Sequence, residues 1–168
     1  LPEKLTSING YAFESDTSLT DIKLPNSLTL IDEDAFANSG LLSIDIPGSV
    51  TEIGSKAFTG VPLKGINLNE GLQKISNMAF YLNSEAKNTI NEITIPDSVT
   101  TIGNSILGNR VVNTLNIGDG VASMDSSMFN KLIVSNLNIG KNSSKSQEIL
   151  EDGFKGLDAT KEKTINIY

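Results

Sequence analysis

The spacing of phenylalanine is the feature that most constrains how this chain can fold. Its six phenylalanines are Phe13, Phe36, Phe58, Phe80, Phe129 and Phe154, and the successive gaps are 23, 22, 22, 49 and 25 residues. Leu107 divides the longest gap into 27 and 22 residues and stands where the repeat would place a phenylalanine. A period of about 22 residues predicts a stacked solenoid in which each repeat supplies one coil.

Each repeat follows the same order of local structures. In the segment Ile44–Pro47, apolar residues alternate with period two, which predicts a short strand that proline ends because it has no backbone N–H. Val50 and Ile53 return two more apolar side chains to the interior, and Ala57–Phe58 closes the coil. We expect a short helical or 3₁₀ turn over residues 55–58.

Stacked copies of this unit predict a repeat solenoid of about 22-residue coils. One face should carry a parallel β-sheet, and the opposite side short helical or 3₁₀ turns or irregular structure. We expect a single solenoid domain over residues 1–168, with partial repeats at both ends, as in a piece of a longer protein. The first buried row of the sheet should be Ile22, Ile44, Ile66, Ile93, Leu115 and Leu137.

The motif is similar to that of a known repeat family. Residues 41–58 follow the pattern Leu-x-x-Ile-x-Ile-Pro-x-Ser-Val-Thr-x-Ile-Gly-x-x-Ala-Phe, which returns at 90–107 with Leu107 for the phenylalanine. This pattern resembles the BspA-like type of leucine-rich repeat, although Asn69, Gly118 and Gly140 replace proline. The resemblance implies a curved or twisted leucine-rich repeat solenoid of an exported or surface protein, mostly bacterial. It also implies roles in adhesion, host-protein binding or cell–cell contact, and no catalytic residues.

Composition excludes several classes of chemistry. Cysteine, histidine and tryptophan are absent, which removes cysteine nucleophiles, Ser-His-Asp triads, Cys/His zinc sites and disulfides. No apolar run approaches the length of a membrane span. Gly118-Asp119-Gly120 lacks the context of a phosphate-binding loop and reads as a turn. We therefore expect neither a cofactor nor direct membrane insertion within this segment.

The net charge of −7 falls within residues 1–52, and residues 53–168 are neutral. Such a distribution argues against binding to nucleic acid or to anionic membranes, because a protein binds either through basic patches. The acidic third could serve a basic partner or calcium, or could simply be a solvated face. Asp32-Glu33-Asp34 is its densest cluster, and an exposed turn is the simpler interpretation of it.

The candidate binding face consists of outward strand residues, because side chains alternate across a strand. Its members are Lys23, Asp45, Asn67, Thr94, Asn116, Asn138 and Asn166. Amide side chains could hydrogen-bond a protein backbone or a glycan; alternatively, stacked asparagines bond one another and only stabilise the sheet.

Two interruptions of the repeat, at 81–89 and 141–146, predict projecting loops that either bind a ligand or have drifted neutrally. Their candidate residues are Tyr81, Asn83, Glu85 and Lys87 in the first loop, and Lys141, Asn142 and Lys145 in the second.

These observations predict a non-catalytic protein- or glycan-binding module of a bacterial cell-surface or secreted protein. Its ligand would be an extracellular protein or glycan, with host extracellular matrix as one candidate, and adhesion is the expected role. Two alternatives stay open at this point: a structural spacer that carries another domain, and a substrate-positioning region of a secreted enzyme.

Overall fold

The structure is a computed structural model, and the residues that it describes are 1–84, 88–121, 127–140 and 164–167. Every regular element within this part is a β-strand, and every strand pair is parallel. The strands are β1 (Ser7–Ile8), β2 (Leu30–Ile31), β3 (Ser43–Ile46), β4 (Glu52–Ile53), β5 (Gly65–Leu68), β6 (Lys74–Ile75), β7 (Thr89–Ile95), β8 (Thr101–Ile102), β9 (Val111–Ile117), β10 (Ile133–Ile139) and β11 (Thr164–Ile167). The chain is therefore a parallel β-solenoid, as the repeat predicts.

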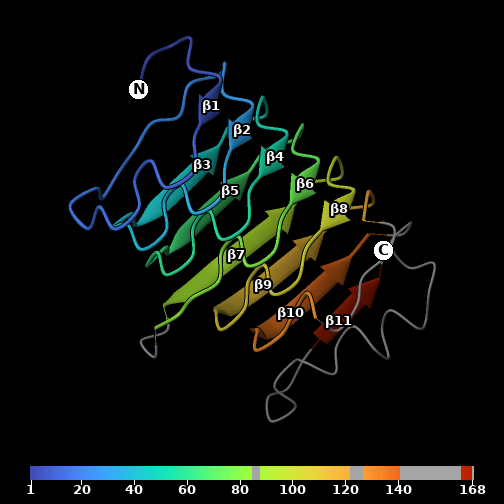
Figure 1. The fold of residues 1–168 in the computed structure, drawn as a ribbon. Coiled ribbons are helices and arrows are strands. Elements are labelled where there is room, and N and C mark those ends of the chain that lie inside the picture. Colours follow the sequence, from blue (N-terminus) through green and yellow to red (C-terminus); the bar gives the residue numbers. More distant parts are fainter. Residues whose placement is uncertain (85–87, 122–126, 141–163, 168) are drawn as a thin grey trace.

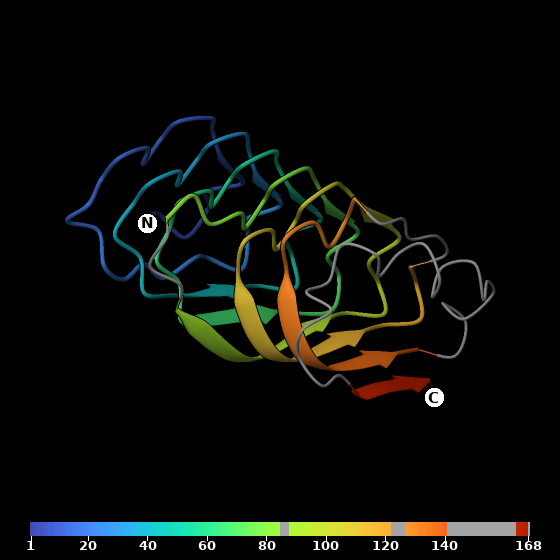
Figure 2. The same cartoon turned by 90° about the horizontal axis from the view of Figure 1, so that it is seen from below.

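The strands form two rows along the solenoid (Figure 1). The wide row contains β3 and β5 in one ladder and β7, β9, β10 and β11 in another, and β5 packs beside β7. The narrow row is β1-β2-β4-β6-β8, built from two-residue strands. Figure 2 shows the wide row along one side of the coils and the turns on the other. Within each ladder, equivalent residues of successive repeats are direct neighbours.

The alternation predicted for the strands is observed. In β3 and β5 the exposed or half-exposed residues alternate with buried ones. Of the first predicted row, Ile44, Ile66, Ile93, Leu115 and Leu137 are buried, while Ile22 is partly buried against the same core.

Four phenylalanines, one from each of the first four turns, stack on one another through the interior. Ring centroids lie 5.0 Å apart between Phe13 and Phe36, 5.1 Å between Phe36 and Phe58, and 5.2 Å between Phe58 and Phe80, with interplanar angles of 6–8°. Leu107 is buried, as expected for a residue that takes the place of phenylalanine in its repeat.

The prediction of a helical or 3₁₀ turn over residues 55–58 is wrong. The turns opposite the sheet are irregular, which was the other structure expected there. No helix occurs among the described residues, and hence none long and apolar enough to cross a bilayer. Lys56 has φ of 55° and Gly60 has φ of 74°, whereas a 3₁₀ helix requires negative φ throughout. The N–H of Ala57 closes a local turn onto Gly54, but the N–H of Phe58 donates to the carbonyl of Ala79 in the next coil (2.7 Å). Contacts between coils thus replace helical bonds.

The first repeat also differs from expectation: we placed Ile22 in the first buried row of the sheet, but the segment Ile22–Pro25 forms no strand. Just before this segment and just before β3, the N–H of Leu42 donates to the carbonyl of Thr20 (3.2 Å), so the two coils are bonded at this point. Leu24 is buried but Ile22 is only partly covered, so the end of the sheet holds this coil less completely than an interior coil.

The strands of the wide row lengthen from four residues in β3 and β5 to seven in β7, β9 and β10. Pro62 precedes β5 and cannot donate to a ladder, whereas β7 begins Thr89-Ile90 and so continues the ladder with β-branched residues. Figure 2 shows the longer strands bending around a corner of the coil. Asn113 donates to the side-chain oxygen of Asn91 (3.3 Å), its counterpart in the preceding coil.

Arg110 is fully buried, which nothing in the repeat predicted. Its guanidinium donates to the carbonyls of Phe80, Val61 (2.9 Å) and Leu63 (3.5 Å), all from earlier repeats. Burial lowers the pKa of the Arg110 guanidinium to about 10, so the side chain stays charged at neutral pH. The buried charge is therefore held by backbone carbonyl groups beside the first interruption of the repeat.

Replacing Phe58 by alanine should lower the free energy of unfolding by roughly 3–5 kcal/mol, because the ring is buried between two stacked neighbours. Urea titration followed by circular dichroism measures this loss. Phe13→Ala is the matched control and should cost less, since Phe13 is only partly buried. A loss below about 1 kcal/mol for Phe58→Ala would contradict a core role for the stack.

Replacing Arg110 by methionine should also destabilise the protein, by roughly 1–3 kcal/mol. Methionine fills similar space, but the carbonyl groups that accept from the guanidinium belong to the backbone and would lose their donor. Lys64→Met, which removes an exposed cation, is the control and should leave the urea midpoint nearly unchanged. Equal stability of Arg110→Met and the parent would show that these carbonyls need no donor.

Candidate functional site

The wide row of strands places most of the candidate binding face on one surface. Asp45 pairs in register with Asn67, and Thr94 with Asn116, which pairs in turn with Asn138. The backbone of Asn166 continues this row next to Asn138. Asp45, Asn67 and Thr94 are exposed, whereas Asn116 and Asn138 are half-buried. Lys23 is exposed too, but it lies in the segment that forms no strand.

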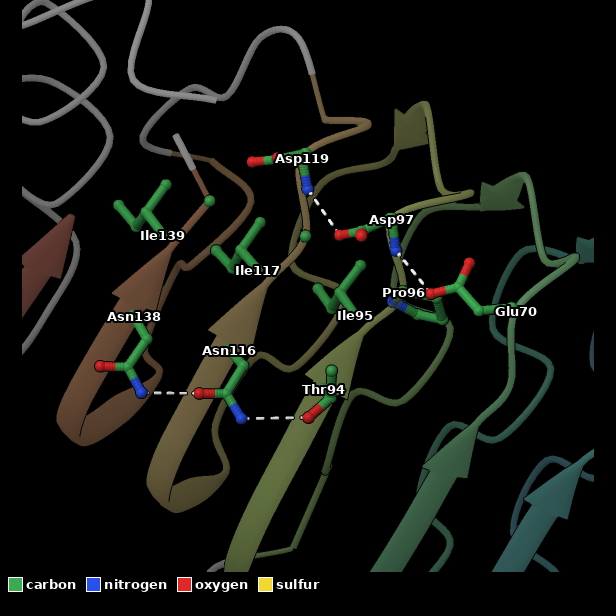
Figure 3. A pocket seen from close by; sticks show the side chains of 12 residues that line it. Glu70, Thr94, Ile95, Pro96, Asp97, Asn116, Ile117, Asp119, Asn138 and Ile139 are labelled. Carbon is green, nitrogen blue, oxygen red and sulfur yellow. Dashed lines mark hydrogen bonds between the residues drawn. The ribbon is translucent and has the colours of Figure 1, made fainter. Parts of the chain in front are cut away.

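Side chains along this row are hydrogen-bonded to one another (Figure 3). Asn138 donates to the oxygen of Asn116 at 2.6 Å, and the amide nitrogen of Asn116 donates to Thr94 Oγ1 (3.0 Å) and Glu92 Oε1 (2.7 Å). Farther along, Asn67 donates to Asp45 Oδ1 (2.7 Å). The amides are therefore held in fixed orientations, and their mutual bonds use much of their capacity to bind a ligand.

A second row of side chains follows the rim where the strands end. Asp119 donates its backbone N–H to Asp97 Oδ1 (2.9 Å), and Asp97 donates its own to Glu70 Oε1 (3.0 Å). Ser98 donates its backbone N–H to the other oxygen of Glu70 (3.1 Å). These carboxylates thus accept from the turn of the following coil and connect successive repeats.

Glycine in place of proline changes the rim. The N–H groups of Gly118 and Gly140 donate to the carbonyls of Ile95 (2.9 Å) and Ile117 (2.8 Å), bonds that proline could not make. A Cβ on Gly118 would lie 2.6 Å from Asp97 Oδ1, too close for any other residue without rearrangement.

The rim encloses a shallow hollow of about 510 Å³ between the two rows of polar side chains (Figure 3). Its lining includes Glu70, Asp97, Asn116, Asp119 and Asn138. The lining offers hydrogen-bond donors and acceptors and carries no nucleophile with an adjacent base. No group of three or more acidic, histidine or cysteine side chains within the described residues is placed to hold a metal ion.

The first interruption of the repeat is anchored at both ends. Asn109 donates to the carbonyls of Leu82 (2.8 Å) and Ser84 (3.3 Å), and Asn88 donates to that of Pro62 (3.3 Å). Leu82 is buried, so the segment is tied to the core at its start.

The predicted loop residues are only partly described. The carbonyl of Tyr81 accepts from the N–H of Gly60 (2.8 Å), and Asn83 donates to the side chain of Asn38 (3.1 Å). Both are turned toward the phenylalanine turns rather than the sheet face. The remaining predicted loop residues lie outside the described part of the chain; they are Glu85, Lys87, Lys141, Asn142 and Lys145.

Sequence reasoning missed two features of this region, the buried Arg110 and the carboxylates along the rim. A signal existed for the second, because Glu70, Asp97 and Asp119 all occupy the position after the proline or its replacement. Arg110 gave a weaker signal, because its position in the repeat is occupied elsewhere by residues as different as Ser39, Val61 and Asn83.

The geometry can be compared with known proteins. The family described as "BspA type Leucine rich repeat region (6 copies)" matches residues 1–88 and 86–166. The chain belongs to this family. No curated protein matches this BspA-type repeat chain. Its fold is similar to the crystal structure of the pneumococcal vaccine antigen PcpA, with a TM-score of 0.63 and 22% sequence identity. That similarity covers 98% of this chain and 49% of the antigen's, so the BspA-type chain spans about half of that structure.

Changing Asn116 to aspartate should lower the free energy of unfolding by about 0.5–1.5 kcal/mol at pH 7. The change removes the donor to Thr94 and places a carboxylate beside Glu92, so the two negative charges repel. Because salt screens the repulsion between exposed charges, the deficit should shrink when NaCl is added. Asn136→Asp, on the same face, is the control and should change urea stability little at low or high salt. A deficit that is the same at both salt concentrations would exclude repulsion as its cause.

Proposed function

We propose that this chain is a non-catalytic module that binds a protein or glycan ligand on the wide sheet face. The observation that supports this proposal is the row of polar side chains on this face, which their own hydrogen bonds hold in place in two groups. A face ordered before the ligand arrives loses little side-chain freedom on binding, so many weak polar contacts can sum to useful affinity.

A bacterial cell-surface or secreted location fits this role. Both the family and the similarity to a pneumococcal vaccine antigen support that location. Adhesion to host extracellular matrix is the function that we consider first, and the ligand would be a matrix protein or a matrix glycan.

A structural spacer is the second candidate, and one observation favours it. The amides of Asn67, Asn116 and Asn138 already bond neighbouring side chains, which is what a face with a purely stabilising role would show. The two candidates differ in whether the face has any ligand.

Binding to an array of extracellular-matrix proteins and glycans tests the proposal. Ser43→Arg and Asn136→Arg place a large cation at two ends of the face, where both native side chains are exposed. Asn130→Arg makes the same change in charge at an exposed residue of the phenylalanine turn. We expect a ligand that the parent and Asn130→Arg bind and that at least one face variant loses at least tenfold.

The proposal fails in two ways. A ligand that both folded face variants retain would place the contact elsewhere on the molecule. The absence of any ligand on the array would favour the spacer.

A further inference from the structure

The wide sheet face carries a second hollow, of about 540 Å³, over the start of β5. It lies between β3 and β7, where the outward row runs from Ser43 through Gly65 to Glu92. Gly65 has no side chain to fill its position, and Ser43 has a small one. The lining also includes Asp45, Lys64, Asn67 and Asn91. The hollow therefore exists because of the residue types at two neighbouring positions.

The fold itself does not require glycine at residue 65. Its φ lies outside the left-handed region, and a Cβ built there would meet Ser43 Cβ at 3.6 Å, an ordinary van der Waals contact. The equivalent positions in β7 and β9 carry Glu92 and Thr114. Neither backbone conformation nor close packing requires glycine at this position. The hollow can therefore be filled by a larger side chain without a change in the fold.

Two carboxylates flank the hollow from opposite sides. Asp45 Oδ1 accepts from Asn67 (2.7 Å) and Asn69 (2.9 Å), and Glu92 Oε1 accepts from Asn116 (2.7 Å). These bonds engage one oxygen of each carboxylate and fix both groups in place. Among the described residues, the one ion pair joins Lys74 to Glu52. The carboxylates of Asp45 and Glu92 are therefore not paired with a lysine.

Lys64 is the one cation of the lining, and it leaves the hollow with a net charge of −1. Its side chain is exposed, and its flexible stem allows the ammonium group to move aside. The lining contains no aromatic ring on which a sugar could stack. Two carboxylates are also far fewer oxygen ligands than calcium requires.

We infer that this hollow receives a basic side chain, lysine or arginine, from a protein partner. The cationic group lies between the carboxylates of Asp45 and Glu92, and its aliphatic stem lies over Gly65. The inference rests on the proposed function and gives it a partner chemistry: a protein segment with an exposed basic residue. Lys64 opposes the incoming charge and so limits the affinity.

The test uses acetyl-Gly-Gly-Lys-Gly-Gly-amide as the probe, titrated into the ¹⁵N-labelled chain and followed by NMR. The same peptide with norleucine in place of lysine has the same stem without the charge. We expect saturable shifts of the amide signals of Gly65, Asn67 and Glu92 with the lysine peptide and none with the norleucine peptide.

Substitutions at the hollow show whether the lysine peptide binds there or is attracted to the acidic protein as a whole. Asp45→Asn and Glu92→Gln keep the shape and should each raise the Kd of the lysine peptide about two- to fivefold, the range of exposed ion pairs. Lys64→Gln should lower the Kd by a similar factor. Gly65→Leu fills the hollow and should raise the Kd at least tenfold. Glu33→Gln removes one charge at an exposed turn and should leave the Kd unchanged.

Several results would overturn the inference. Equal shifts with the norleucine peptide would show that charge is not recognised, and equal weakening by Glu33→Gln and Glu92→Gln would show diffuse attraction. The isosteric pair Asp45→Asn and Glu92→Gln decides the matter even if Gly65→Leu fails to fold. An array ligand lost by Asn136→Arg but kept by Gly65→Leu would exclude the hollow while leaving the sheet face as the binding surface.

Discussion

Hydrogen bonding between successive coils is the interaction on which the rest of this structure depends. Strands of two residues, such as β4 and β6, have almost no stability of their own, and each exists because the next coil pairs with it. The phenylalanine turns follow the same principle, since the N–H of Phe58 donates to Ala79 and not to its own turn. Stability therefore comes from repetition, and each coil depends on its neighbours.

This dependence explains why the sequence predicted some features and not others. Residues that must match the same residue in the next coil recur, so the buried rows and the phenylalanine stack could be predicted from spacing alone. The turn over 55–58 was wrongly expected to be helical because its spacing suits a 3₁₀ turn. The positive φ of Lys56 cannot be inferred from lysine, which rarely adopts it.

Arg110 could not have been predicted for a related reason. It compensates for a departure from the period, and a repeat pattern contains no information on how a departure is accommodated. The inserted segment follows Phe80, and the guanidinium supplies a donor to the carbonyl of that residue and of Val61. The candidate face was predictable in position, because alternation fixes which residues point outward. Its hydrogen bonds depend on side-chain conformation and needed the structure.

The same dependence limits where a ligand site can develop. Asn116 donates to two neighbouring side chains, and the carboxylates of Glu70 and Asp97 accept from the following coil, so changes at these positions disturb the stack. Outward residues whose side chains make no hydrogen bond to a neighbouring coil can be replaced without loss of stability. Gly65 is one of them, because the coil requires neither its backbone conformation nor its lack of a side chain. Specificity in a solenoid of this kind is therefore expected at outward positions between the hydrogen-bonded rows, where a single residue can open or fill a hollow.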